Sequence, residues 1–247
     1  MNPPSAMRSA RECPQRKGHW LLQNPKKGGL ILGKTAFLIV DMQKDFCLPG
    51  APFEVIGAMT VSGKIKEALE ACRVHGLPVV HVFRYYRADG SDVELTRYDG
   101  FVRAGTSLVR GTEPARILDE LKPVDGEYLV VKQRWSAFFQ TELDMLLRRL
   151  GVDQIVVTGV QTPNCIRGTV WDANSLDYEV IVLTDGTGAK TDAVHEANLL
   201  DMKNIGIQLM TTEEFIKSLP NPPRENHVAK IRADIEKKKI IPEPSTY

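Results

Sequence analysis

The sequence lacks any apolar run of about 18 residues, and no apolar segment follows Met1 as a secretory signal requires. These two absences exclude a membrane-spanning helix and an export signal from the expected features. We therefore expect no membrane partner and a cytoplasmic location. The N-terminal stretch is basic and poor in acids, so targeting to an organelle is an open alternative.

Cysteine is scarce: the chain has four, at positions 13, 47, 72 and 165, with no CxxC spacing and no clustering. This pattern argues against a zinc site and against a disulfide scaffold, and it is typical of a reducing compartment. The cysteines therefore indicate no bound metal, and nothing else in the sequence indicates a cofactor.

Excess charge is also missing, because the net charge is only +1 over 247 residues. Such a balance gives no general attraction to nucleic acid. The distribution is uneven: residues 1–34 carry seven Lys and Arg against one acid, and residues 221–247 carry six against four. We predict a basic irregular extension at 1–32, one domain at 33–219, and a C-terminal extension at 220–247 that contains a basic amphipathic helix.

Solid apolar runs alternate with helical patterns through the body of the chain. The expected strands are at 35–40, 77–83, 128–132, 155–157, 180–183 and 207–210. Strands that are apolar on both faces are typical of a parallel sheet covered on both sides. The sequence thus predicts an α/β fold, a three-layer αβα sandwich with a mostly parallel six-stranded sheet. The long polar stretch 84–111 interrupts this pattern, and loops of that length are often functional.

The segment around Cys165 has the pattern of a nucleophile site. The apolar run 155–157 predicts a buried strand ending at Gly159, Thr162 is a suitable helix N-cap, and Pro163 suits the first helical position. Cys165 then falls in the first turn, where the helix dipole favours the thiolate. A buried structural cysteine is the alternative, but strand, turn and helix in this order favour catalysis.

Three reactive side chains follow the carboxyl ends of predicted strands: Asp41, Lys132 and Cys165. These ends meet at one edge of a parallel sheet, so we expect the three to converge. There the carboxylate can act as general base and acid, the ammonium can hold it, and the thiolate can attack a carbonyl. Backbone N–H groups in the turn from Gln161 to Cys165 are placed to receive an oxyanion.

Three sequence runs carry a resemblance to a known family: 37–46 (FLIVDMQKDF), 132–138 (KQRWSAF) and 158–165 (TGVQTPNC). Together they resemble the isochorismatase-like cysteine hydrolase superfamily, which includes nicotinamidases, N-carbamoylsarcosine amidohydrolases and ureidoacrylate amidohydrolases. The resemblance implies a catalytic triad of Asp41, Lys132 and Cys165, and a homodimer or homotetramer. It also implies a cis peptide at Val160–Gln161 that places the N–H groups of Gln161 and Cys165 in the oxyanion hole.

The chain departs from nicotinamidases of this family in lacking the histidines that bind their metal, since residues 83–111 contain none. Family isochorismatases lack the cysteine, so Cys165 favours amide chemistry. We predict a metal-independent cysteine amidohydrolase that cleaves a C–N bond of a small amide or ureide through a thioester. The alternatives are a nicotinamidase-like enzyme with an atypical site, and a non-catalytic member that uses Cys165 as a redox sensor or its surface as a binding module.

Substrate-binding residues are predicted from the same region. Arg84 or Arg87 is expected to hold a substrate carboxylate or carbonyl, because guanidinium groups match these oxygens in a bidentate way. Phe46, Trp135 and Phe138 are expected to form an apolar pocket wall, with burial in the core as the alternative for each.

Overall fold

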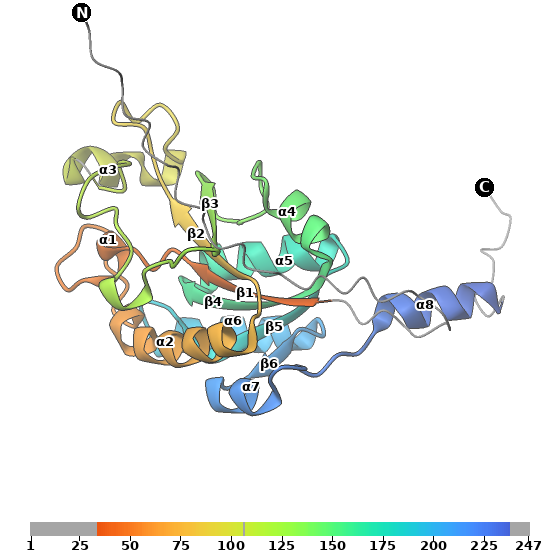
Figure 1. The fold of residues 1–247 in the computed structure, drawn as a ribbon. Coiled ribbons are helices and arrows are strands. Elements are labelled where there is room, and N and C mark those ends of the chain that lie inside the picture. Colours follow the sequence, from red (N-terminus) through yellow and green to blue (C-terminus); the bar gives the residue numbers. More distant parts are fainter. Residues whose placement is uncertain (1–33, 106, 238–247) are drawn as a thin grey trace, which may run out of the picture. The chain divides into compact units, whose positions relative to one another are not determined.

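The computed structural model describes residues 34–105 and 107–237, and its centre is a six-stranded sheet with the order β3-β2-β1-β4-β5-β6 (Figure 1). The strands are β1 (Lys34–Val40), β2 (Val79–Arg84), β3 (Tyr128–Lys132), β4 (Val152–Val160), β5 (Glu179–Gly188) and β6 (Gln208–Met210). Every neighbouring pair is parallel, which confirms the predicted fold class. The expected extension at 1–32 lies outside the described residues.

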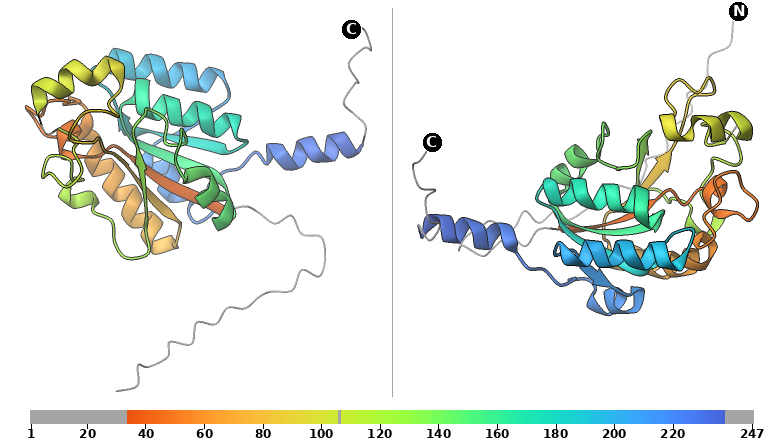
Figure 2. Two further views of the ribbon diagram at one scale, coloured as in Figure 1. Left: turned by 90° about the horizontal axis from the view of Figure 1, so that it is seen from above. Right: turned by 180° about the vertical axis from the view of Figure 1, so that it is seen from behind.

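Helices cover both faces of the sheet (Figures 1 and 2). They are α1 (Lys44–Cys47), α2 (Ala58–His75), α3 (Tyr98–Ala104), α4 (Leu143–Leu150), α5 (Arg167–Ser175), α6 (Asp192–Asn204), α7 (Thr212–Ser218) and α8 (His227–Glu236). Phe37 and Ile39 of β1 pack in one core with α2 and α7, and Leu38 and Val40 pack in the other with α4, α5 and α6. Both faces of β1 are therefore buried, which explains its solid apolar run.

Strands β1 and β4 come unusually close at their carboxyl ends. Val40 pairs with Gly159, whose φ is 111°, and a Cβ on Gly159 would lie 2.0 Å from the Val40 carbonyl oxygen. Only glycine fits this contact and this backbone conformation. Asp41, with φ 55°, turns the chain away directly after β1. The glycine thus brings the segment after β4 close to the Asp41 carboxylate.

The structure differs from the sequence prediction in two connecting segments. The polar stretch 84–111 is not a plain loop, because it contains a 3-10 turn (Leu95–Arg97) and α3. The sequence also predicts a short helix from Pro114 to Leu121, but this segment forms only a 3-10 turn at Asp119–Leu121. The reason is tertiary: the carbonyls of Pro114 and Arg116 accept hydrogen bonds from the N–H groups of Asp45 and Lys44, so they are unavailable for a helix.

The C-terminal segment contains the predicted helix, α8, whose apolar residues Val228, Ile231 and Ile235 are exposed. The chain before it is held against the amino ends of the strands. Gln154 Nε2 donates to the Pro223 carbonyl at 2.8 Å, and Arg224 Nη2 donates to the Thr35 hydroxyl at 2.8 Å. Within residues 34–105 and 107–237, none of the helices has the length and apolarity that a membrane crossing requires.

Candidate active site

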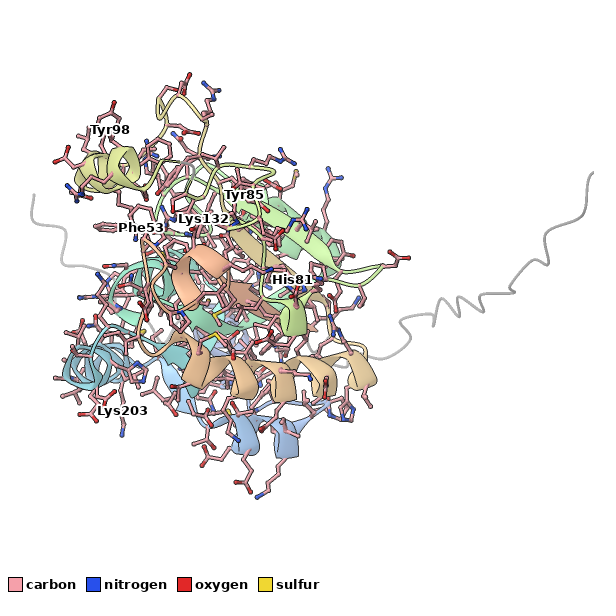
Figure 3. All side chains as sticks on the ribbon, turned by 90° about the vertical axis from the view of Figure 1, so that its left-hand side faces the viewer. Phe53, His81, Tyr85, Tyr98, Lys132 and Lys203 are labelled. Atoms are coloured by element: carbon pink, nitrogen blue, oxygen red, sulfur yellow. The ribbon has the colours of Figure 1, made fainter. Side chains whose placement is uncertain are left out.

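Four buried reactive side chains lie at the carboxyl ends of four adjacent strands. Asp41 follows β1, Arg84 ends β2, Lys132 ends β3, and Cys165 lies just after β4. Lys132 is fully buried, and its carbonyl accepts a hydrogen bond from Tyr85 N–H at 3.3 Å; both residues are labelled in Figure 3. The structure brings Asp41, Lys132 and Cys165 together at this edge of the sheet, with Arg84 as a fourth member.

Asp41 and Lys132 form a fully buried ion pair. Lys132 Nζ donates to Asp41 Oδ2 at 2.7 Å and to the Arg134 carbonyl at 3.1 Å. Burial lowers the pKa of Lys132, and the nearby Asp41 carboxylate opposes that effect. Asp41 Oδ1 has no hydrogen-bond partner among the described residues, although it is buried. A carboxylate oxygen without a partner in such a place is free to accept a proton from a reacting group.

Cys165 lies in a π-helical turn, Thr162–Ile166, that leads into α5. The N–H of Ile166 donates to the Gln161 carbonyl at 3.2 Å. The N-cap is Gln161, whereas the sequence predicted Thr162. The Thr162 hydroxyl is engaged elsewhere, by His195 Nδ1 at 2.8 Å. The boundary therefore shifts by one residue, while Cys165 stays in the first turn. π-Turns of this kind are frequent at functional sites.

Arg84 links the sulfur to the ion pair. Its Nη2 donates to Cys165 Sγ at 3.2 Å, and its Nε lies 3.7 Å from Asp41 Oδ2. Nη1 donates to Glu94 Oε1, an ion pair between two buried side chains. Burial disfavours the charge of Arg84, but the Cys165 sulfur and the Asp41 carboxylate outweigh it and raise the pKa above its ordinary value. Arg84 is therefore a permanent cation beneath the thiol.

A substrate-binding role for Arg84 stays a prediction, although its position differs from the one expected. The sequence suggested a substrate ligand in a polar loop, but the residue ends a strand and its charge is already balanced by Glu94. Glu94 also accepts a hydrogen bond from Tyr86, whose pKa burial raises to about 12. Tyr86 therefore stays a donor at neutral pH. Arg84 follows the strand-end rule that identified Asp41 and Lys132, whereas no local signal in 84–111 marks Glu94.

The backbone around Gln161 agrees with the resemblance, because the peptide bond between Val160 and Gln161 is cis. The Gln161 side chain is nearly buried, and its Oε1 accepts from Asn164 Nδ2 at 3.4 Å. The assignment of the Gln161 and Cys165 N–H groups to an oxyanion hole stays a prediction.

An open groove of about 940 Å³ lies in front of the Cys165 turn. Its lining includes Val93, Glu94, Trp135, Phe139, Pro163, Asn164, Arg167 and Trp171. Trp135 thus lies where a pocket wall was expected. Phe138 and Phe46 do not: Phe138 packs on Tyr178 with ring centroids 5.6 Å apart, and Phe46 packs on Phe53 at 6.3 Å. Both side chains are buried, Phe46 in α1 and Phe138 in the segment after β3.

Arg87 lies apart from the thiol. Its side chain is exposed and lines a second, smaller pocket of about 290 Å³ with Asp92, Gln133 and Arg134. The backbone N–H of Arg87 donates to Asp92 Oδ1 at 2.9 Å, which fixes the turn rather than the guanidinium. A role in holding substrate stays a prediction for this residue.

The segment after β2 does not fit a metal ion. Within the described ranges, no group of three or more His, Cys, Asp or Glu side chains is arranged to hold one. From this segment Arg84 binds the thiol, and the same guanidinium binds Tyr86 and already pairs with the Glu94 carboxylate. A second cation there would be repelled. His81, in the middle of β2, instead pairs with Glu127 at 2.8 Å.

Residues 35–214 match the family model of the isochorismatase domain, close to three quarters of the chain. The chain belongs to the isochorismatase family. It is 42% identical over 188 residues to an Arabidopsis thaliana protein named probable inactive nicotinamidase, covering 75% of this chain and 96% of that protein. It is 30% identical over 218 residues to a ureidoacrylate amidohydrolase of Stutzerimonas stutzeri, covering 81% and 88%.

Among solved structures, this isochorismatase-family chain resembles an isochorismatase family protein from Desulfovibrio vulgaris. The two share 47% sequence identity with a TM-score of 0.73, over 76% of this chain and 99% of the other. The similarity confirms the α/β fold with its parallel sheet. It also confirms the recognition of the family from the three sequence runs around Asp41, Lys132 and Cys165.

Proposed function

We propose that this isochorismatase-family protein is a metal-independent cysteine amidohydrolase that cleaves a C–N bond of a small amide or ureide. One observation carries the proposal: a buried thiol and a carboxylate with a partnerless oxygen are bridged by one guanidinium. Arg84 Nη2 is 3.2 Å from the sulfur of Cys165, and Arg84 Nε is 3.7 Å from Asp41 Oδ2. A structural cysteine needs neither neighbour.

The proposed reaction begins with transfer of the Cys165 thiol proton to Asp41. The thiolate attacks the carbonyl carbon, and the N–H groups of Gln161 and Cys165 stabilise the oxyanion that forms. Asp41 then gives its proton to the leaving nitrogen, which departs as ammonia or an amine. Water, deprotonated by Asp41, hydrolyses the thioester and restores the thiol. Lys132 holds the carboxylate in place through its 2.7 Å hydrogen bond.

The named relatives bear on the substrate in different ways. A ureidoacrylate amidohydrolase at 30% identity supports ureide or amide cleavage. The relative named probable inactive nicotinamidase fits a chain in which Arg84 and Glu94 stand after β2 in place of metal-binding histidines. We therefore propose an amide other than nicotinamide. A homodimer or homotetramer and a cytoplasmic location stay predictions from the resemblance and the composition.

An ammonia-release screen tests the proposal. The panel holds nicotinamide, maleamate-like, ureidoacrylate-like, biuret and carbamoyl amino-acid substrates, with Cys165→Ala as the blank and Cys72→Ala as the matched control. Cys72 is fully buried and burial raises its pKa, so its loss should leave turnover intact. Release by the Cys165→Ala protein at the wild-type rate would refute the mechanism. Rapid labelling of Cys165 without release from any substrate would favour the non-catalytic alternative.

A further inference from the structure

Glu94 shares the Arg84 guanidinium with the Cys165 thiol, so it already pairs the cation that a substrate anion at the thiol would need. Its carboxylate binds Arg84 Nη1, while Nη2 of the same guanidinium binds the Cys165 sulfur. Glu94 also lines the groove in front of Cys165. We propose that Glu94 is a specificity-determining residue that restricts the site to amides and ureides whose group adjacent to the reacting carbon is uncharged. The substrate class rests on the amidohydrolase function proposed above.

The charges around the sulfur are already balanced. Arg84 and Lys132 supply two positive charges, and Asp41 and Glu94 supply two negative charges, on side chains that are at most 9% exposed. Transfer of the thiol proton to Asp41 moves one negative charge onto the sulfur and leaves this balance unchanged. A carboxylate on the substrate beside the reacting carbon would add a negative charge, and among the described residues both buried cations near the sulfur, Arg84 and Lys132, are already paired. Charge without a partner is costly in such a place, whereas a neutral group is not.

The other two cationic side chains of the groove, Arg167 and Arg134, cannot balance such a substrate charge, because Arg167 is already paired and Arg134 lies at the exposed rim. Arg167 Nη2 pairs with Asp201 at 2.7 Å, and its guanidinium lies over Trp171 at 4.8 Å. Arg134 is exposed at the border with the Arg87 pocket and donates to the Asp92 carbonyl at 2.7 Å. A remote acidic group can therefore be tolerated at the rim. The discrimination concerns only the atoms next to the reacting carbon.

The rest of the groove is suited to an apolar group. Trp135 and Phe139 are about half exposed, and both line the groove with Trp171. Aromatic walls of this kind favour flat, apolar ligand groups. We therefore infer a neutral amide or ureide that carries an apolar or aromatic substituent.

Two alkylating reagents of similar shape, one neutral and one anionic, test this proposal. Iodoacetamide is neutral and iodoacetate carries a carboxylate beside its reacting carbon. Second-order rates at Cys165 are measured by peptide mass spectrometry, and each is divided by the rate of free glutathione. Both reagents consume the same thiolate, so their ratio cancels any change in the thiolate fraction. The wild-type ratio should favour iodoacetamide at least tenfold more than glutathione does.

The decisive variant is Glu94→Gln, which should lower that preference about tenfold by speeding the reaction with iodoacetate. Glu94→Asp keeps the charge and should keep the preference, which guards against a simple packing defect. Glu113→Gln removes an exposed acid that pairs with Lys44 and should change nothing. Melting curves for all four proteins establish that they are folded.

A wild-type ratio equal to that of glutathione would overturn the proposal, as would an unchanged ratio in Glu94→Gln. A thiol at position 165 that reacts with neither reagent would also overturn it, because the groove would then not lead to the sulfur. None of these readouts requires turnover. Failure of the ammonia screen with a preserved ratio would therefore remove the amidohydrolase function and leave the charge discrimination standing.

Discussion

Strand β2 carries two buried ionic clusters on opposite faces of the sheet, and they differ in how completely their charges are satisfied. His81 pairs with Glu127, which also binds Arg73 of α2. Three residues further on, Arg84 binds Glu94 and Cys165 on the opposite face. Residues three apart on a strand point to opposite faces, so one strand supports both clusters.

The His81 cluster is a closed structural unit. Glu127 Oε1 accepts from Arg73 Nε at 2.7 Å, and Oε2 accepts from Arg73 Nη2 at 3.0 Å and from Val124 N–H at 3.0 Å. Nδ1 of His81 lacks a partner, but burial lowers the pKa of this histidine, so the atom belongs to a neutral ring. Within the described residues, no buried charged atom of this cluster lacks a hydrogen-bond partner.

In the Arg84 cluster the partnerless atoms belong to charged groups. Asp41 Oδ1 and Arg84 Nε are both buried without a hydrogen bond among the described residues. Such atoms lower stability, and they are retained where a substrate or a proton is to be received. Burial and ion pairing alone therefore do not identify a functional site. Buried charged atoms without partners, next to a nucleophile and a groove, do identify one.

The largest expected effect follows from Asp41→Asn. Loss of the general base should lower kcat about 10²–10⁴-fold. Asp45→Asn is the matched control, because Asp45 is a neighbouring buried carboxylate bound by the Ser107 hydroxyl at 2.9 Å and by Leu108 N–H at 2.6 Å. Both variants should lose stability in urea unfolding, but only Asp41→Asn should lose turnover per folded molecule. Equal losses of turnover would contradict the assigned role.

Arg84→Gln should have the next largest effect. A charge-assisted hydrogen bond contributes about 1.5–3 kcal/mol, so alkylation of Cys165 by iodoacetamide should slow roughly 10–100-fold at neutral pH. Arg73→Gln removes the corresponding cation of the other cluster and should leave this rate unchanged. The double variant Arg84→Gln, Glu94→Gln avoids an unbalanced buried carboxylate and should be equally slow. Wild-type alkylation rates in both Arg84 variants would show that the Arg84 guanidinium does not activate the thiol.

Glu127→Gln should act on stability instead of chemistry. Removing the charge that Arg73 and His81 share should cost about 1–3 kcal/mol of unfolding free energy, with the alkylation rate of Cys165 unchanged.

The pH dependence of unfolding tests whether the stability lost in Glu127→Gln comes from the charge of Glu127. Burial alone would raise the pKa of Glu127, but hydrogen bonds from Arg73, Val124 N–H and His81 lower it to about 2, against 4.5 ordinarily. The unfolded chain therefore binds the proton first as pH falls, and stability is lost between about pH 5 and pH 2. His81, whose pKa is lowered by burial, adds a loss that begins nearer pH 6.5. Urea midpoints across pH 2–7 should show a shallower acid slope in Glu127→Gln.

Much of this architecture is predictable from the sequence, and the limits have physical reasons. Asp41, Lys132 and Cys165 follow strong strand signals, and the order of the three sequence runs indicates the family. The position of Glu94 could not be predicted. It depends on how the 84–111 segment folds back over the strand ends and brings this carboxylate to Arg84. Phe46 and Phe138 are buried, which is the alternative that the sequence left open, because tertiary packing and not local pattern decides which aromatic side chains near the strand ends face the groove.

The smallest effect is expected from Arg87→Ala. The side chain is exposed in the smaller pocket beside Arg134, and the backbone N–H of this residue makes the bond to Asp92. Truncation keeps that bond, so KM for an uncharged amide and the alkylation rate of Cys165 should each change less than about twofold. An acidic amide provides the sharper measurement. A KM that rises steeply for it alone would show that the rim holds a remote carboxylate, while Glu94 excludes one at the thiol.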